Sequence, residues 1–466
     1  MGNVTTQTLE APRVFPKVSP RLHKLTRVPY VDPVAIEERN EQTFATRQIH
    51  AGAVVDSDVG ARVTPIYQSA GYVFPSYDEA EARFSGESVG RAYSRGDNPT
   101  NVVAGKRIAN LEGGRNGLVV SSGQAAIAMT LFSLAASGDH ILSTASLYGG
   151  TRQLFDGSLT RQGLNFEFLR ADASEEEWLA RIRPETRAVY TESIPNPKND
   201  VVDLELLGRV AAKAGVPLIV DNTVATPYLC RPIEWGADIV IHSTSKWLSG
   251  HGSVIGGVIV DAGKFDWAAN SERFPHFTKG SFEGAPSFIE RYGADTFMSY
   301  VKSVTVLDYG PTVPPTSTFL LLHGIETLSL RMERHVANAQ RVAEWLEARP
   351  EVASVDYSGL PSNEYHALAQ KYLPDGAGSV VSFDLPGGPD AARKFVEALD
   401  LVSHMTHIGD VRSLALHMES TIFKRSSQEQ RDEAGVTPGL IRLSIGIEGI
   451  EDILADLERG LEATRS

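Results

Sequence analysis

The chain has 466 residues, of which 42% are hydrophobic and 22% charged, as is ordinary for a globular protein that folds without disulfides or metals. Acidic residues outnumber basic ones by 58 to 44, which argues against nucleic acid as a partner, because phosphate binding needs a basic surface. Cys230 is the single cysteine, and no apolar run reaches the roughly 20 residues of a membrane span, so we expect a cytosolic (cytoplasmic) protein without a membrane partner.

The first 45 residues differ from the remainder of the chain. They show no sustained apolar period and contain Pro12, Pro16, Pro20, Pro29 and Pro33, so we predict an extended arm. An organelle-targeting peptide is the alternative, although the prolines would interrupt the amphipathic helix that such a peptide needs. We assign residues 1–95 to this arm and to a segment that contacts a neighbouring subunit.

Short apolar runs alternate with helical patterns over residues 96–305. Residues 116–122, 187–193, 217–223 and 237–243 predict buried strands, and residues 124–137 predict an alanine-rich helix. Buried strands that alternate with helices indicate a parallel sheet covered on both faces, so we predict a large α/β domain over residues 96–315.

The pattern changes in the last third of the chain. A long helix is predicted over residues 327–348, shorter mixed pieces follow, and a final helix is predicted over residues 450–463. We therefore expect residues 316–466 to form a second, smaller α+β domain.

One lysine stands at the carboxyl end of a predicted strand. Lys246 follows Ser243 and Ser245 and precedes a glycine-rich turn, and Asp221 ends the preceding strand 25 residues earlier. Ligands of open α/β sheets bind at such strand ends, where a partly desolvated lysine can form a Schiff base. Pyridoxal phosphate requires this pair, because a lysine binds its aldehyde and an acid keeps its ring nitrogen protonated. A surface lysine and a helix-capping aspartate are the plain alternatives.

Three further segments suit the remaining parts of that cofactor. Ser122, Gly123 and Gln124 lie between a predicted strand and helix, where backbone N–H groups can hold a phosphate. Tyr148 precedes two glycines, and its ring could stack on a pyridine, while Arg95 is a phosphate-binding type of residue in a loop. The alternatives are an ordinary turn, a half-buried tyrosine and a solvated arginine.

Other chemistries find little support in the sequence. There is no H-E-x-x-H motif and no cysteine–histidine cluster, so we expect no metal. The G-x-S-x-G elbow of hydrolases is absent. Residues 250–257 are rich in glycine but lack the G-x-G-x-x-G spacing of a dinucleotide-binding turn.

Taken together, these residues resemble a known family, the fold-type I pyridoxal-phosphate enzymes of cysteine and methionine metabolism. The matching motifs are Tyr93-x-Arg95, Ser122-Gly123-Gln124, Leu147-Tyr148-Gly149-Gly150-Thr151, Asp221-Asn222-Thr223 and Ser243-x-Ser245-Lys246. The resemblance spans residues 49–461 and is greatest to the O-acetylhomoserine sulfhydrylase branch, on segments 65–68, 258–267, 328–335 and 435–444. It implies a fold-type I α/β transferase with a mostly parallel seven-stranded sheet and a smaller α+β C-terminal domain.

The resemblance also implies roles for individual residues. As catalytic residues, Lys246 would bind the cofactor and move protons on the substrate, Asp221 would hold the pyridinium proton, and Tyr148 would stack on the ring and assist proton transfer. Arg442 would clamp the substrate carboxylate, helped by Ser413 and Tyr93. The other cofactor contacts would come from Gly123, Gln124, Asn196, Thr223, Ser243 and Ser245, with Tyr93 and Arg95 reaching in from a neighbouring subunit. A homodimer or homotetramer with shared active sites follows from the last pair.

The implied reaction is a γ-replacement, in which sulfide displaces acetate from O-acetyl-L-homoserine to give homocysteine. Two alternatives stay open: another carbon, nitrogen or sulfur nucleophile, and a γ-lyase that yields 2-oxobutyrate and ammonia. Gly150 counts against the lyase, because the methionine-lyase branch typically has cysteine there. A non-catalytic scaffold is disfavoured, since it would not need Lys246, Asp221 and Arg442 together.

Two segments depart from the sulfhydrylase pattern. Residues 418–423 read Met-Glu-Ser-Thr-Ile-Phe where that branch usually reads Pro-Ala-Ser-Thr-Thr-His, and residues 311–318 also differ. The family uses the first segment near the mouth of the active site. We therefore expect any consequence to fall on the choice of nucleophile and not on the cofactor.

Overall fold

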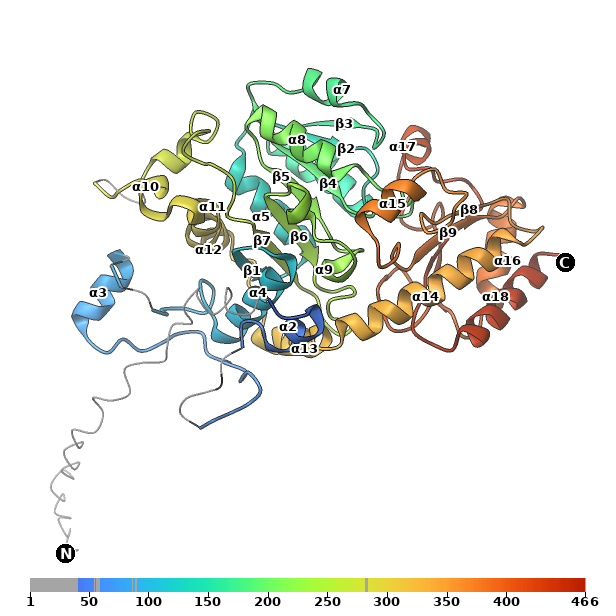
Figure 1. The fold of residues 1–466 in the computed structure, drawn as a ribbon, viewed down its shortest axis with the longest axis horizontal. Helices are drawn as coiled ribbons and strands as arrows, with labels where there is room; N and C mark the ends of the chain where they lie inside the picture. Colours follow the sequence, from blue (N-terminus) through green and yellow to red (C-terminus); the bar gives the residue numbers. More distant parts are fainter. Residues whose placement is uncertain are drawn as a thin grey trace, which may run out of the picture.

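The computed structural model describes residues 41–53, 55, 59–85, 87–88, 90–280 and 284–465. A seven-stranded sheet forms the larger unit, and a smaller C-terminal unit with a second sheet lies beside it (Figure 1). The arm predicted for the first 45 residues lies largely outside the described residues. Close to the start of the described residues, helix α2 (Phe44–His50) packs on α4 (Pro99–Glu112) through a hydrogen bond from Arg47 to the Asn110 carbonyl.

The large sheet has the strand order β1-β7-β6-β5-β4-β2-β3. Its strands are β1 (Asn116–Val120), β2 (His140–Thr144), β3 (Asn165–Leu169), β4 (Thr186–Glu192), β5 (Leu218–Asp221), β6 (Ile239–Ser243) and β7 (Gly257–Asp261). Only β7 runs antiparallel to its neighbours, and the pairs among β2 to β6 are parallel. The prediction of a mostly parallel, seven-stranded sheet is confirmed.

Alternate residues along the strands explain why this sheet is covered on both faces. Val240 packs with Leu218 in one hydrophobic cluster, whereas Ile239 and Ile219 pack in the other. Helices α4 (Pro99–Glu112) and α8 (Leu204–Ala214) supply side chains to the first cluster, and α5 (Gly123–Leu134) supplies side chains to the second. The central strands β5 and β6 therefore bury both of their faces, as a parallel sheet covered by helices requires.

Local signals place the ends of these helices. The Asn98 side chain accepts a hydrogen bond from the Thr100 amide at the start of α4, and Gly113, with φ of 78°, ends that helix. The remaining α-helices are α2 (Phe44–His50), α3 (Tyr77–Ser85), α6 (Gly149–Gln153), α7 (Glu175–Ala180), α9 (Thr226–Leu229), α10 (Phe288–Tyr292), α11 (Thr296–Tyr300), α12 (Val306–Tyr309), α13 (Pro315–Ile325), α14 (Leu328–Glu347), α15 (His366–Tyr372), α16 (Gly388–Ala398), α17 (Gln428–Glu433) and α18 (Ile450–Thr464). Short 3₁₀ or π turns occupy η2 (Leu154–Leu159), η3 (Pro232–Trp235), η4 (Pro275–Thr278), η5 (Gly293–Asp295) and η6 (Val301–Thr305).

The C-terminal unit contains a five-stranded sheet of order β10-β11-β12-β9-β8. Its strands are β8 (Ser354–Asp356), β9 (Val380–Asp384), β10 (Ser403–His404), β11 (Leu414–His417) and β12 (Leu440–Ser444). Helices α14, α16 and α18 bury their apolar faces in one cluster with this sheet. The long helix α14 runs from beneath the large unit into the smaller one (Figure 1), so it ties the two together.

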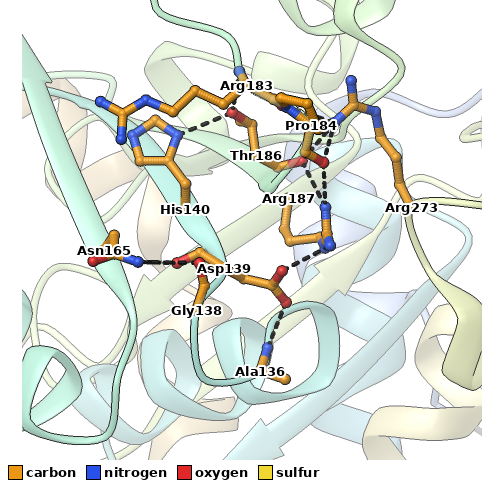
Figure 2. A network of polar contacts seen from close by, with 10 residues as sticks. All are labelled: Ala136, Gly138, Asp139, His140, Asn165, Arg183, Pro184, Thr186, Arg187 and Arg273. Atoms are coloured by element: carbon orange, nitrogen blue, oxygen red, sulfur yellow. Dashed lines mark hydrogen bonds and ion pairs between the residues drawn. The ribbon is translucent and has the colours of Figure 1, made fainter.

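A polar network ties the amino-terminal ends of β2 and β4 together (Figure 2). Asp139 accepts from Arg187 at 2.7 Å and from the Ala136 amide at 2.8 Å. Arg273 donates to the carbonyl of Thr186 at 3.0 Å. These contacts hold the loop before β2 against the start of β4, so we interpret the network as structural.

Within the described part of the chain, no helix is both long enough and apolar enough to cross a bilayer.

Candidate active site

A cavity of about 380 Å³ lies at the carboxyl ends of β4, β5 and β6, between the two units. Side chains of the large unit form most of the wall, and residues 406–408 and Arg442 contribute from the C-terminal unit. Ten predicted site residues line this cavity: Gly123, Gln124, Tyr148, Asn196, Asp221, Thr223, Ser243, Ser245, Lys246 and Arg442.

Lys246 follows β6, and its amine contacts the ring of His407. The Lys246 Nζ and His407 Nδ1 atoms lie 3.1 Å apart. Burial, followed by the nearby Arg442 guanidinium, lowers the pKa of Lys246 to about 8. A substantial fraction of this amine is therefore neutral near physiological pH, as nucleophilic and basic chemistry require.

Asp221 ends β5, next to β6, and Thr223 holds its carboxylate in place. The Thr223 amide donates to Asp221 Oδ1 at 3.0 Å, and the Thr223 hydroxyl donates to the same oxygen. That hydroxyl in turn accepts from the Ser243 amide at 2.8 Å, which links the ends of the two strands. Withdrawal from water raises the pKa of Asp221, whereas the Thr223 hydrogen bonds and His242 act in the opposite direction. The carboxylate and the Lys246 amine thus face one cavity.

A second carboxyl group, Glu192 at the end of β4, also lines the cavity. Its Oε1 accepts from the Tyr148 amide at 2.8 Å. Burial and the neighbouring Asp221 raise the pKa of Glu192 well above its ordinary value. Glu192 was not among the predicted site residues, although its position at a strand end beside β5 is a signal of the kind that identified Asp221.

An anion cradle forms where β1 turns into α5. The Ser122 hydroxyl caps this helix by accepting from the Ala125 amide, and the N-terminal amides of α5 border the cavity. A Cβ at Gly123 would lie 2.7 Å from the Ser243 Cβ, so only glycine allows the helix to approach β6 this closely. Ser243 and Ser245 also line this part of the wall, and the residues present fit a phosphate group.

Arg442 lies on β12 and is almost fully buried. It donates to Asn196 Oδ1 at 3.0 Å and to the Thr406 carbonyl at 3.1 Å. Burial lowers the pKa of Arg442 to about 10, so the side chain stays cationic at neutral pH. A buried guanidinium with a planar array of donors at a cavity wall suits a carboxylate ligand.

The Tyr148 ring packs directly against Gly150. The Tyr148 ring is 41% exposed and lines the cavity. A Cβ at Gly150 would lie 2.4 Å from the Tyr148 Cε1 atom, so any larger residue would displace the ring. Packing against the Tyr148 ring therefore explains why residue 150 is glycine.

Three predicted site residues lie away from the cavity. Tyr93 is 52% exposed, and Arg95 lines a separate hollow on the surface. Ser413 is fully buried, and its hydroxyl donates to Glu448 and accepts from the Gly446 amide. Because that hydroxyl is already engaged in structural bonds, we do not carry Ser413 forward as a substrate ligand.

The unusual segment at residues 418–423 does not line the Lys246 cavity. Met418 and Phe423 are buried in a small apolar cluster, and Glu419 lies 3.9 Å from Arg431. Ile422 borders a different cavity of about 290 Å³ beside α6. The other departure, residues 311–318, packs at the end of β1, where the Pro311 carbonyl accepts from the Ser121 amide.

Comparison with known proteins agrees with this geometry. Residues 45–462 match the family described as Cys/Met metabolism PLP-dependent enzyme. The chain is 46% identical to the homocysteine synthase of Schizosaccharomyces pombe, over 90% of this chain and 98% of that one. It is 42% identical to the O-acetyl-L-homoserine sulfhydrylase of Corynebacterium glutamicum, over 90% and 97%.

A solved structure gives the same result. A Campylobacter jejuni protein named as an O-acetylhomoserine (thiol)-lyase, which contains a pyridoxyl-lysine phosphate, superimposes with a TM-score of 0.87 at 34% identity. The alignment covers 90% of this chain and all of that one. The match in sequence and the match in fold extend over nearly the whole described chain, so this protein belongs to the family of Cys/Met metabolism PLP-dependent enzymes.

Proposed function

We propose that the chain transfers the aminocarboxypropyl group of O-acetyl-L-homoserine to sulfide, forming homocysteine and acetate. The observation that carries this proposal is the meeting of an amine, a carboxylate and a buried guanidinium, from Lys246, Asp221 and Arg442, on one cavity. The choice of substrate follows the relatives named homocysteine synthase and O-acetyl-L-homoserine sulfhydrylase. A methionine-biosynthetic role and a cytosolic location belong to the same proposal.

Pyridoxal phosphate, when bound, supplies an electron sink for negative charge that develops on the substrate. Lys246 would bind it and then take and return protons, a task that suits an amine with a pKa of about 8. Asp221, held by Thr223, would keep a proton on the ring nitrogen. Arg442 would orient the substrate by binding the substrate carboxylate.

The other wall residues would bind the cofactor, and Tyr148 among them would also assist proton transfer. Gly123, Gln124, Ser243 and Ser245 would hold the phosphate beside the start of α5. Tyr148 would pack on the ring, and Asn196, fixed by Arg442, would border it.

Product analysis tests the reaction. Purified protein with pyridoxal phosphate and O-acetyl-L-homoserine should release homocysteine only when sulfide is added. Formation of 2-oxobutyrate without sulfide would assign a γ-lyase instead. Turnover only with another carbon, nitrogen or sulfur compound would retain the electrophile and reject sulfide.

We also propose a homodimer or homotetramer in which Tyr93 and Arg95 complete the site of a neighbouring chain. The segment that carries them extends from the body of the molecule (Figure 1) and exposes Val73, Tyr77 and Phe84. Exposed apolar side chains of this kind are typical of a surface that contacts another chain.

A mixing experiment tests shared sites. Arg95→Ala and Lys246→Ala should each be inactive alone. Mixed after reversible dissociation, they should recover up to about a quarter of wild-type activity, because about half of the dimers are then mixed and each mixed dimer holds one complete site. No recovery from a mixture shown by mass spectrometry to contain mixed dimers would place Arg95 in its own chain's site or outside any site.

A further inference from the structure

The amine of Lys246 has one side-chain hydrogen-bond partner among the residues that the structure describes. That partner is His407, whose Nδ1 lies 3.1 Å from the Lys246 Nζ. His407 follows β10 in the C-terminal unit, and its side chain lines the cavity. The contact therefore joins the two units at the lysine that we assign to the cofactor.

Structural bonds do not explain the placement of this imidazole. The His407 Nε2 is buried and has no hydrogen-bond partner in the described part of the chain. His417 shows the contrasting pattern, since its Nδ1 pairs with the Ser420 hydroxyl and its Nε2 with the Pro438 carbonyl. His335 also leaves its Nε2 unpaired among the described residues, but its Nδ1 bonds the Ile445 backbone carbonyl, which is a structural partner. His407 uses its one hydrogen bond on Lys246.

The charges around His407 decide which atom donates. Burial, followed by the positive charge of Lys246, lowers the pKa of His407 to about 4, while Asp410 raises it and Arg442 lowers it. The ring is therefore neutral at pH 7. A protonated lysine can only donate, so His407 Nδ1 accepts, and the ring proton resides on Nε2.

We propose that His407 is a positioning residue for Lys246, whose Nδ1 accepts a hydrogen bond from the lysine amine, holds that amine at the cavity wall and sets how readily it loses its proton. The proposal rests on the cofactor role given to Lys246 above. A hydrogen bond to the protonated form of a group favours that form. His407 thus opposes the effect of burial and of Arg442, both of which favour the neutral amine.

The test uses cofactor-free protein and does not depend on turnover. Pyridoxal phosphate is mixed with protein at pH 6 to 10, and the rate of covalent capture is followed by absorbance. Borohydride reduction and mass spectrometry then locate the label. The variants are His407→Leu, which removes the acceptor, and His407→Asn, which retains one. His404→Leu is the matched control, because His404 is exposed nearby and lies outside the cavity.

The wild-type capture rate should inflect near pH 8, with the label on Lys246. In His407→Leu the inflection should fall by about one pH unit, the tenfold change that loss of a hydrogen bond to a charged group gives. His407→Asn and His404→Leu should keep the wild-type inflection. Nitrogen NMR of the wild-type protein should show the His407 ring proton on Nε2.

The other possible results would overturn either the role of His407 or the cofactor role of Lys246. An unchanged or raised inflection in His407→Leu, with Lys246 labelled, overturns the role of His407 and leaves the proposed function intact. A His407→Asn variant as altered as His407→Leu shows that ring packing, not the acceptor, matters. Wild-type label on another lysine overturns the cofactor role of Lys246 and this proposal with it.

Discussion

Removing the hydroxyl of Thr223 should make the Asp221 carboxylate harder to ionise. In Thr223→Val the side chain keeps its volume and shape, but Asp221 loses one hydrogen bond and the Ser243 amide loses its acceptor at 2.8 Å. A hydrogen bond to a charged group contributes about 1.5–3 kcal/mol. At about 1.4 kcal/mol per pH unit, its loss should raise the pKa of Asp221 further by about one to two pH units.

Asp221 is the proposed counter-ion of the cofactor ring, so a hydrogen-bond loss of this size on its charged form should lower pyridoxal phosphate affinity by up to about 10- to 100-fold at pH 7. The deficit should shrink as the pH rises, because a higher pH favours the ionised form of Asp221. Absorbance titration of cofactor-free protein measures both quantities. Thr223→Ser, which keeps the hydroxyl, should bind within about threefold of wild type, since its donor is unchanged. Equal affinity of Thr223→Val and wild type at pH 7 would refute the reasoning.

Three further changes have expected outcomes. Burial raises the pKa of Asp261 to about 7, above its unfolded value near 4, so its charge costs stability above pH 7 and that cost disappears as the pH falls toward 4. Asp261→Asn should therefore raise the free energy of unfolding by up to about 4 kcal/mol at pH 8 and by little at pH 4, as urea unfolding at both pH values will show. Gly150→Ala should displace Tyr148 and weaken cofactor binding by about fivefold, whereas Gly157→Ala, with no atom within 4 Å of its new Cβ, should not. Lys246→Ala should lower turnover by a factor on the order of 10³ and show no covalent cofactor on reduction.

The sequence was sufficient for those parts of the site that follow from strand ends. A spacing of 25 residues between Asp221 and Lys246 predicted neighbouring strands, and β5 pairs with β6. Three strands of the large sheet were not predicted, because their patterns are weak. Residues His140–Thr144 begin and end on polar residues, Asn165–Leu169 is an edge strand with a charged residue, and Gly257–Asp261 follows a glycine-rich turn.

Contacts between distant segments could not be predicted from local pattern. His407 and Lys246 are 161 residues apart, and Arg442 and Asn196 are 246 residues apart, so only the docking of the C-terminal unit brings each pair together. Ser413 illustrates the converse. The family resemblance implied a substrate ligand at Ser413, but the Glu448 carboxylate and the Gly446 amide engage its hydroxyl.

Two carboxyl groups face a cavity whose proposed chemistry needs one negative charge. Burial raises the pKa of both Glu192 and Asp221, and the Asp221 charge raises that of Glu192 further, so the pair cannot carry two charges cheaply. Thr223 donates twice to Asp221, and His242 favours its ionised form, whereas the Tyr148 amide and the Thr151 side chain favour the ionised form of Glu192. Burial and the Asp221 charge favour a proton on Glu192, and the two Thr223 bonds favour the charge on Asp221. A neutral Glu192 can fix the Tyr148 backbone without competing for a positive ring nitrogen, as the counter-ion role proposed for Asp221 requires.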